Sequence, residues 1–295
     1  MADTQSLVYA QAYAANIMQL AQQKYAKLMP LVYMKPNVTG KVFCQDQIGK
    51  WAMQTKGGRN VQTPNNDPNM ARRMGTLVDY HDNRMLDRGD ELRMISDPRS
   101  SYTIAAAASL GRQIDTVIAN QILATSYSGE LGATAVTLGT TSIAAHVNPT
   151  GTTTGTPATL TFARVRAAKR VLDLEDVEME DRFFVVSPSG MDQLLNTTQA
   201  TSSDYNAVKA LVRGEIDTWM GFKWIMSNQL SSSGTLTSCF AMNRYAICLA
   251  LGQEPIVRTD ERTDLSYSWQ VYYELNIGAV RLEEARIVQM DVTSE

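Results

Sequence analysis

The stretch from Ser96 to Ser126 constrains the fold more than any other part of the sequence, because it reads as one long helix. Asp97 can cap this helix, and Pro98 suits its first turn. Such a helix is roughly 40 Å long, which is too long for a local brace. We expect it to be a spine to which separate sub-structures attach. Apolar and small residues recur along it at the spacing of one helix face: Ile104, Ala108, Gly111, Ile114, Ile118 and Ile122.

Gly111 is the one glycine inside this helix pattern. In a helix interior, glycine costs roughly 1 kcal/mol relative to alanine. A glycine at this position therefore indicates that another part of the protein approaches the helix backbone closely.

The charge balance is mildly acidic, with 27 Lys and Arg against 30 Asp and Glu in 295 residues. This length allows one large domain or a few interleaved lobes. No block of basic residues is interleaved with aromatic residues, which argues against a dedicated nucleic-acid-binding protein.

The three cysteines, Cys44, Cys239 and Cys248, form no Cys-x-x-Cys pair. They predict neither a disulfide framework nor a zinc site, and they fit a reducing compartment. The N-terminus has no basic segment followed by an apolar core, and no run of about 18 apolar residues occurs. We therefore expect a soluble protein without a secretory signal or a membrane span.

An N-terminal helix is predicted from about Leu7 to Met29, with Pro30 ending it. Its apolar side can pack either on the core of its own chain or on a neighbouring molecule. That side carries Tyr9, Tyr13, Ile17, Leu20 and Leu28.

The segment from Pro36 to Asp82 predicts a two-stranded arm, with one strand at Val42–Ile48 and a second at Met74–Tyr80. The connection between them, GKWAMQTKGGRNVQTPNNDPN, has too few large apolar residues to build a core. Such an arm is marginal alone, so it is either a flexible insertion or it finds a partner on another subunit. Trp51 and Met53 favour the second alternative, because exposed side chains of this kind are otherwise uncovered apolar surface.

The rest of the chain predicts an α/β lobe followed by a β-rich end. A charged run precedes the long helix, and a Thr- and Gly-rich loop or hairpin region follows it, at residues 128–160. The expected lobe contains helices at Thr161–Glu175, Pro188–Leu195 and Tyr205–Val212, with strands at Arg182–Ser187 and Gly221–Ser227. The expected later strands are Cys239–Met242, Ala246–Leu251, Ile256–Thr259, Tyr267–Ile277 and Arg286–Val292.

We find no pattern that predicts a catalytic, cofactor-binding or metal-binding residue. The two histidines, His81 and His146, have no metal-binding spacing. Ser189 in VVSPSGM superficially resembles the nucleophile of a hydrolase, but the first glycine of Gly-x-Ser-x-Gly is absent. A helix that begins at Pro188 and is capped by Ser187 explains the same residues. The acidic cluster at residues 173–181 falls at a helix end and a turn, which indicates a solvated surface.

The order of these parts resembles the major capsid proteins of tailed bacteriophages, which share the Hong Kong 97-type shell fold. The resemblance covers nearly the whole chain and depends on the order of segments rather than on a catalytic signature. The segments that carry it are GKWAMQTKGGRN, DRGDELRMISDPRSSYTIAAAASLGRQIDTVIANQIL, RFFVVSPSGMDQLL, GFKWIMSNQL and IGAVRLEEARIVQMDV.

The resemblance implies an α+β fold with the parts named in that family. These are an N-terminal arm at residues 1–35, an extended β-hairpin loop at 36–81 and a peripheral domain with the spine helix at 82–127. An α/β axial domain follows at 128–250, and residues 251–295 return to the peripheral domain as strands.

The resemblance also implies a structural, non-enzymatic protein of the virion. Many copies would form the pentamers and hexamers of an icosahedral phage head that encloses double-stranded DNA without sequence-specific binding. Assembly would take place in the host cytoplasm, with a portal protein and no membrane. The predicted arm begins close to Met1, so we expect a separate scaffolding protein rather than a cleaved leader. The mildly acidic charge suits a container wall that should not hold the genome tightly.

We expect the subunit interfaces to involve the tip of the extended loop and the N-terminal helix. Some members of the family join loop and neighbouring subunit by a Lys–Asn isopeptide bond, for which Lys50 and Lys56 are placed, although lysines in a polar loop are ordinary. The interface candidates are Lys50, Trp51, Met53, Lys56, Arg59, Tyr9 and Tyr13.

Two alternatives remain open at the level of the sequence. An encapsulin-type nanocompartment shell has the same fold but encloses a cargo enzyme. An α/β hydrolase that uses Ser189 would be a monomer or a small oligomer with esterase-like activity.

Overall fold

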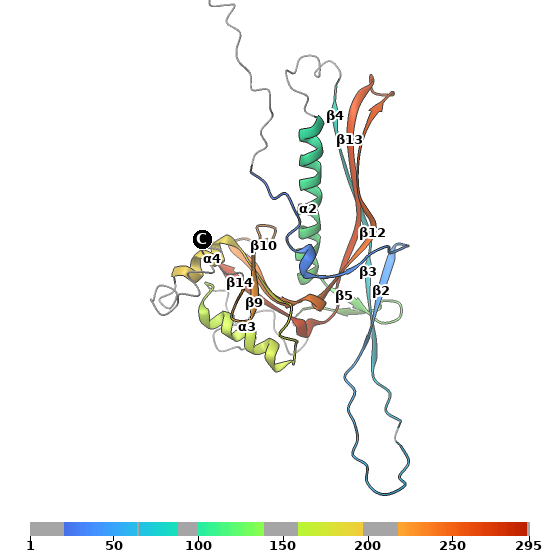
Figure 1. Ribbon diagram of the computed structural model, residues 1–295, viewed down its shortest axis with the longest axis vertical. Coiled ribbons are helices and arrows are strands. Elements are labelled where there is room, and N and C mark those ends of the chain that lie inside the picture. Colours follow the sequence, from blue (N-terminus) through green and yellow to red (C-terminus); the bar gives the residue numbers. More distant parts are fainter. Residues whose placement is uncertain (1–20, 64, 88–98, 139–158, 197–217, 294–295) are drawn as a thin grey trace, which may run out of the picture. The chain divides into compact units, whose positions relative to one another are not determined.

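The long helix is present in the computed structural model of the chain, which describes residues 21–63, 65–87, 99–138, 159–196 and 218–293 (Figure 1). The chain divides into two compact units. The first comprises Met1–Tyr25, Asp79–Arg112 and Pro255–Leu275, and the second comprises Ala26–Val78, Gln113–Glu254 and Asn276–Glu295.

Helix α2, Arg99–Leu123, confirms the predicted spine. Its 25 residues correspond to about 37 Å. Ile104 does not belong to the buried face, since its side chain is 54% exposed. The other predicted positions of that face, Ala108, Gly111, Ile114, Ile118 and Ile122, are buried. Asp97 and Pro98, the expected start of the helix, lie outside the described residues.

The predicted helix from Leu7 to Met29 is wrong for the part that the structure describes. Residues 21–28 are irregular and lead into a short 3-10 helix, Met29–Leu31, that contains Pro30. The side-chain carboxylate of Asp115 on α2 accepts hydrogen bonds from the backbone amides of Lys27 and Leu28, both at 2.9 Å. A tertiary contact therefore satisfies amides that a helix would have paired, and it places Leu28 in the core.

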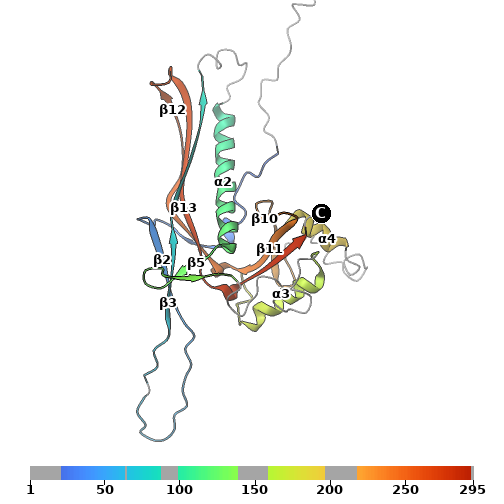
Figure 2. The same ribbon diagram turned by 180° about the vertical axis from the view of Figure 1, so that it is seen from behind.

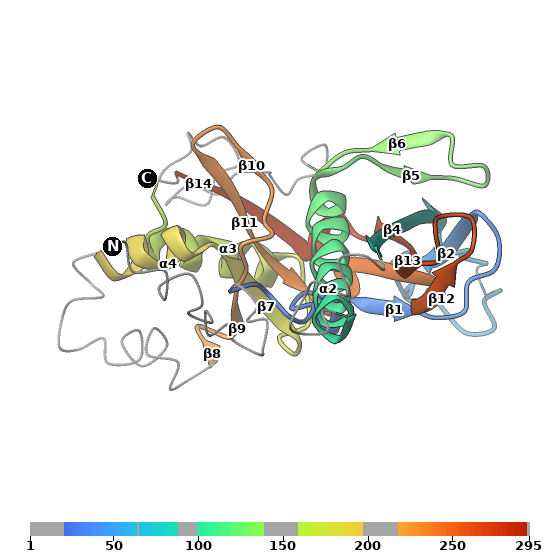
Figure 3. The same ribbon diagram turned by 90° about the horizontal axis from the view of Figure 1, so that it is seen from above.

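A four-stranded antiparallel sheet of order β2-β3-β5-β6 carries the extended loop. Its strands are β2 (Val42–Ile48), β3 (Met70–Thr76), β5 (Ser126–Ser128) and β6 (Thr134–Val136). The last two form a hairpin (Figure 3), as expected for that region of the sequence. The strand predicted at Met74–Tyr80 is instead two strands, because the ladder breaks at Leu77, whose side chain is buried beside Phe43.

A second sheet of order β1-β12-β13-β4 contains the longest strands. These strands are β1 (Tyr33–Lys35), β4 (Val78–Leu86), β12 (Ile247–Arg262) and β13 (Ser268–Arg281). We predicted two strands where β12 is one. Pro255 lies inside β12, where the described pairing with β1, at residues 248–250, has already ended, so that edge of the strand is open to a proline.

The predicted α/β lobe is confirmed as a six-stranded sheet of order β10-β11-β7-β9-β8, with β14 also paired to β11. The β7–β9 pair is parallel, and Phe184 stacks on Trp224 within the core at 4.2 Å between ring centroids. The strands are β7 (Arg182–Val186), β8 (Thr218–Trp219), β9 (Phe222–Met226), β10 (Ser232–Ser233), β11 (Leu236–Asn243) and β14 (Ile287–Thr293).

Two helices of this lobe are described, α3 (Phe162–Leu174) and α4 (Pro188–Asn196), both close to their predicted bounds. Thr161 has the backbone conformation of an N-cap, but its hydroxyl makes no capping hydrogen bond. The helix predicted at Tyr205–Val212 lies outside the described residues. Among the helices that are described, none is both long and apolar enough to cross a membrane.

Candidate assembly surfaces

The extended loop between β2 and β3 projects far beyond its two strands (Figures 1 and 2). Its described residues form neither helix nor strand, and a hydrogen bond from the Gly49 amide to the Asn69 carbonyl closes its base at 2.7 Å. Trp51 is 71% exposed and Met53 is 100% exposed. The three charged candidates of this loop, Lys50, Lys56 and Arg59, are also exposed.

The exposed apolar surface continues to the end of the strands, which the sequence did not reveal. Ile48 and Met70 are direct partners across the β2–β3 ladder, and they are 71% and 72% exposed. Covering a side chain of this size is worth roughly 1.5–3 kcal/mol. Exposed apolar side chains therefore extend from the base of the loop to Trp51 and Met53. The sequence pattern of the strands did not reveal this, because it does not show which face of the strand pair lies away from the core.

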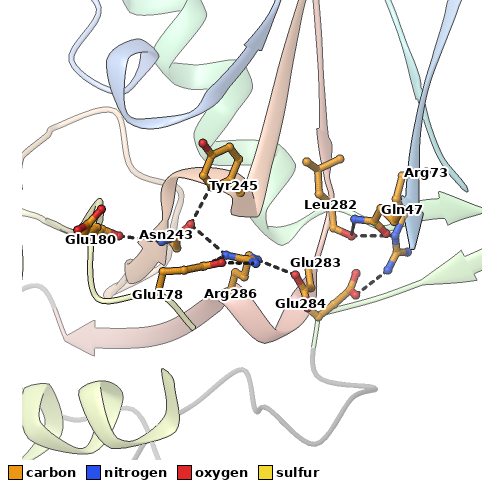
Figure 4. A network of polar contacts seen from close by, with 10 residues as sticks. All are labelled: Gln47, Arg73, Glu178, Glu180, Asn243, Tyr245, Leu282, Glu283, Glu284 and Arg286. Carbon is orange, nitrogen blue, oxygen red and sulfur yellow. Dashed lines mark hydrogen bonds and ion pairs between the residues drawn. The ribbon is translucent and has the colours of Figure 1, made fainter. Parts of the chain in front are cut away.

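The base of the loop is held by buried polar contacts with the turn after β13 (Figure 4). Gln47 on β2 and Arg73 on β3 both donate to the carbonyl oxygen of Leu282 at 3.0 Å. Arg73 also forms an ion pair with Glu284 at 2.7 Å, and both side chains are buried. Removing one partner of a buried pair costs about 3–5 kcal/mol. These contacts fix where the two strands leave the body of the second unit.

Arg281 extends this cluster to the C-terminal end of α2. Its fully buried guanidinium donates to the carbonyl oxygens of Ile122, Ala124 and Val136 at 2.8–2.9 Å, and it pairs with Glu284 at 3.2 Å. Burial lowers the pKa of Arg281, while the hydrogen bond to Glu284 acts in the opposite direction. The last carbonyls of a helix carry partial negative charge, so a cation there is favourable. One side chain thus joins the spine helix, the β5–β6 hairpin and β13.

Arg286 connects the turn after β13 with the α/β lobe (Figure 4). It pairs with Glu178 on the α3–β7 connection and with Glu283 at 2.6 Å, and it contacts the side-chain oxygen of Asn243 at 3.3 Å. The hydrogen bond from Arg286 holds the pKa of Glu178 below its usual range. Sequence reasoning missed Arg73, Arg281 and Arg286 as a group, although the motif that contains RLEEAR supplies two of them.

Two grooves lie beside the loop-bearing sheet. The first measures about 690 Å³ and lies at the base of the loop, lined by Asp46, Ile48, Met70, Arg72 and Glu130 among others. The second measures about 360 Å³ and is lined by β2, β3, the end of α2 and the β5–β6 hairpin, with Tyr127 and Leu131 exposed at its edge. The first groove includes Ile48 and Met70, the exposed apolar residues at the base of the loop.

Ser189 has the surroundings of a helix start. Ser187 accepts a hydrogen bond from the Gly190 amide at 3.1 Å, and its hydroxyl lies 3.0 Å from the Ser189 hydroxyl. The interpretation of Ser187 as the cap of α4 is confirmed. His81 lies exposed on β4, and His146 is outside the described residues, as are Tyr9 and Tyr13. In the described part of the chain, no three His, Cys, Asp or Glu residues are grouped so that they could hold a metal ion.

The sequence profile of the family described as "Phage capsid protein" matches residues 6–294, which is nearly the whole chain. The chain belongs to the phage capsid protein family. No curated protein matches it.

Solved structures of phage capsids have the same fold as this phage capsid protein at low sequence identity. The capsid of Ralstonia phage GP4 superimposes with a TM-score of 0.74 at 11% identity, over 97% of this chain and 95% of that chain. The capsid of Cyanophage P-SCSP1u gives 0.73 at 14% identity, over 98% and 94%. Mycobacterium phage Che8 gives 0.69 at 15% identity, over 96% and 97%. The predicted α+β fold of Hong Kong 97 type is confirmed.

The family match establishes a phage major capsid protein, a structural component of the virion. The matches favour this function over the two alternatives, a nanocompartment shell and a hydrolase that uses Ser189.

Proposed function

We propose that this capsid protein forms the pentamers and hexamers of an icosahedral head around double-stranded DNA, and that the extended loop locks neighbouring subunits together. The observation that carries the second part is the exposure of Trp51 and Met53 on a loop that the described part of its own chain does not cover. Burying both would contribute about 3–6 kcal/mol per subunit contact before the cost of ordering the loop.

In this assembly the charged loop residues form the rim of the contact. Lys50, Lys56 and Arg59 flank the two apolar side chains in sequence, and a polar rim around an apolar centre is typical of protein interfaces. Tyr9 and Tyr13 are the proposed contribution of the N-terminal arm. The loop lysines form ordinary rim contacts in this proposal, and denaturing gels of purified shells should show only monomer-sized bands; a ladder of larger bands would indicate covalent bonds instead.

We propose the division into arm (1–35), extended loop (36–81), peripheral domain (82–127 and the late strands) and axial domain (128–250), with one amendment. Strand β14 pairs with β11 along seven residues, so it is better assigned to the axial sheet than to the peripheral strands. A separate scaffolding protein and a portal protein complete the proposed assembly in the host cytoplasm, and the resemblance to tailed-phage capsids supports them.

The test is a double substitution, Trp51→Ala with Met53→Ala, in the full-length protein. We expect a large loss of closed shells in electron microscopy and sedimentation, because the apolar centre of the contact is removed. The matched control is Leu174→Ala with Met179→Ala, which truncates two similarly exposed apolar side chains on the lobe. A normal yield of shells from the loop variant would show that the loop does not lock subunits.

A further inference from the structure

Helix α3 carries a concentration of positive charge that the capsid fold does not account for. Four of its 13 residues are basic: Arg164, Arg166, Lys169 and Arg170. Arg164 is buried and donates to the backbone carbonyls of Thr159 and Asp291, so it belongs to the core. The other three basic side chains point to the opposite side of the helix, where they line a groove of about 400 Å³.

These cations do not serve the helix itself. A helix is stabilised by acidic residues in its first turn and basic residues in its last turn, because of the partial charges at its two ends. Helix α3 has neither, and Asp173 stands in its last turn. The distribution of charge along α3 therefore runs against the preference of an isolated helix.

Arg166 and Lys169 are not paired with the acidic cluster that follows α3 within the described residues. Asp173 pairs with Arg182 at 2.5 Å, Glu178 pairs with Arg286, and Asp181 lies 3.9 Å from Arg244. Arg166 and Lys169 form no ion pair within the described residues. The Lys169 ammonium lies 3.9 Å from the place that a Cβ at Gly221 would occupy, so its side chain runs past the β8–β9 turn.

From these contacts we infer that Arg166 and Lys169, in the groove that they line on α3, form a binding stripe for the phosphate backbone of double-stranded DNA. This inference rests on the proposed function, and it identifies α3 as a part of the capsid wall that faces the genome. Arg166 and Lys169 lie about 4.5 Å apart along the helix axis, and a duplex carries one negative charge per roughly 1.7 Å of its axis, so neighbouring phosphates lie within reach of both side chains.

The lining of the groove favours a nucleic acid over an acidic protein. Besides the three cations, its described residues are Ala167 and Asp173. Protein interfaces depend on a central cluster of large apolar or aromatic side chains, and none lines this groove. Contact with a phosphate backbone needs only cations, and it is weak and salt-dependent. A few such contacts on a chain of net charge −3 bind DNA reversibly, without sequence preference.

The test measures the binding of a fluorescent DNA duplex to full-length unassembled protein at several salt concentrations. Each lost phosphate contact reduces the slope of log affinity against log salt by about 0.9. We therefore expect Arg166→Gln with Lys169→Gln to reduce this slope by about 1.8. The matched control, Lys41→Gln with Arg258→Gln, removes the same charge from two other exposed positions and should leave the slope unchanged.

A charge-conserving variant separates binding from misfolding. Arg166→Lys with Lys169→Arg should retain the slope of the unmodified protein. The inference is wrong if the Gln variant keeps the slope, if the control loses as much, or if the unmodified protein does not bind the duplex. It is also wrong if polyglutamate at equal charge displaces the labelled duplex as well as unlabelled DNA does, since the stripe would then serve an acidic protein.

A second measurement depends on the assembled shell. In an electron-microscopy reconstruction, α3 should line the lumen; its presence on the outer surface would overturn the inference. Absence of shells, by contrast, would contradict the proposed function while the duplex-binding measurement still decides the role of the stripe.

Discussion

The side chain of Arg281 holds several elements of the second unit together. Three backbone carbonyls and Glu284 depend on its guanidinium, and no part of the side chain is exposed. Charged side chains are rarely buried to this extent unless they are paired. The position of Arg281 explains why the end of the spine helix, the hairpin and the loop base form one body.

We predict that Arg281→Met destabilises the protein by about 3–5 kcal/mol, because it leaves buried carbonyls without a donor and Glu284 with one partner fewer. Denaturant unfolding of the full-length protein measures this change. The comparison is Arg262→Met, which removes an exposed ion pair with Asp264 and should leave the midpoint unchanged. Equal effects of the two substitutions would contradict the central role of Arg281.

Gly111 gives the second prediction at this scale. The residue is buried on α2, as its place in the sequence pattern suggested. Gly111→Leu should reduce stability by about 1–3 kcal/mol through overpacking. Gly111→Ala adds a single methyl group and improves helix propensity, so it is the matched comparison. If Gly111→Leu is as stable as the unmodified protein, no other part of the protein approaches the helix backbone closely at this position.

At the scale of elements, the N-terminal segment is ordered by a side chain far away in sequence. Asp115 holds the amides of Lys27 and Leu28 with both of its carboxylate oxygens. No local pattern contains this information, and the helical periodicity of the first residues therefore led to a wrong helix at residues 21–28. The tertiary contact replaced the local hydrogen bonds.

We predict that Asp115→Asn releases this segment, because the amide group has one acceptor oxygen in place of two. The buried amide that loses its partner costs about 1–3 kcal/mol. Hydrogen exchange should become faster at Lys27 and Leu28. Asp192→Asn on α4 is the control, since Asp192 is exposed. Unchanged protection at both amides would show that other contacts hold the segment.

Glu178, on the α3–β7 connection, makes the stability of the fold depend on pH. Because the pKa of Glu178 is lowered in the folded state by its hydrogen bond with Arg286, the pair stabilises the fold above the usual carboxyl pKa of about 4.3. This contribution is lost as the pH falls through the lowered pKa. The Glu178 side chain is 59% exposed, so the effect should be below about 1 kcal/mol.

We predict that Glu178→Gln lowers stability at pH 6 by this amount, and that the difference between the two proteins shrinks as the pH falls through the lowered pKa of Glu178. Thermal unfolding of both proteins across this range measures the difference. Glu175→Gln on the same connection is the control, because Glu175 forms no ion pair within the described chain. A constant difference at all pH values would assign the effect of Glu178 to packing.

At the scale of the whole molecule, the sequence predicted those elements whose periodicity comes from local packing. The spine helix, α3, α4, β7 and β9 follow this pattern closely. The continuity of β12 through Pro255 and the break between β3 and β4 depend on which edges are paired, and the polar cluster around Arg281 joins residues more than a hundred positions apart. A single sequence carries no direct signal for such contacts. The loop could be predicted because its own segment has too few large apolar residues to build a core around Trp51 and Met53.

The contrast between the buried polar cluster and the exposed loop leads to a prediction for the whole molecule. Deletion of Lys50–Asn60, with a short Gly-Ser connection, removes exposed residues that add nothing to the core of the chain. We therefore expect the unfolding midpoint of the unassembled protein to stay unchanged while closed shells are lost. Arg281→Met should instead reduce the unfolding midpoint of the unassembled protein. A deletion variant that unfolds earlier would show that the loop packs on its own subunit, and one that assembles normally would show that shell closure does not need the loop.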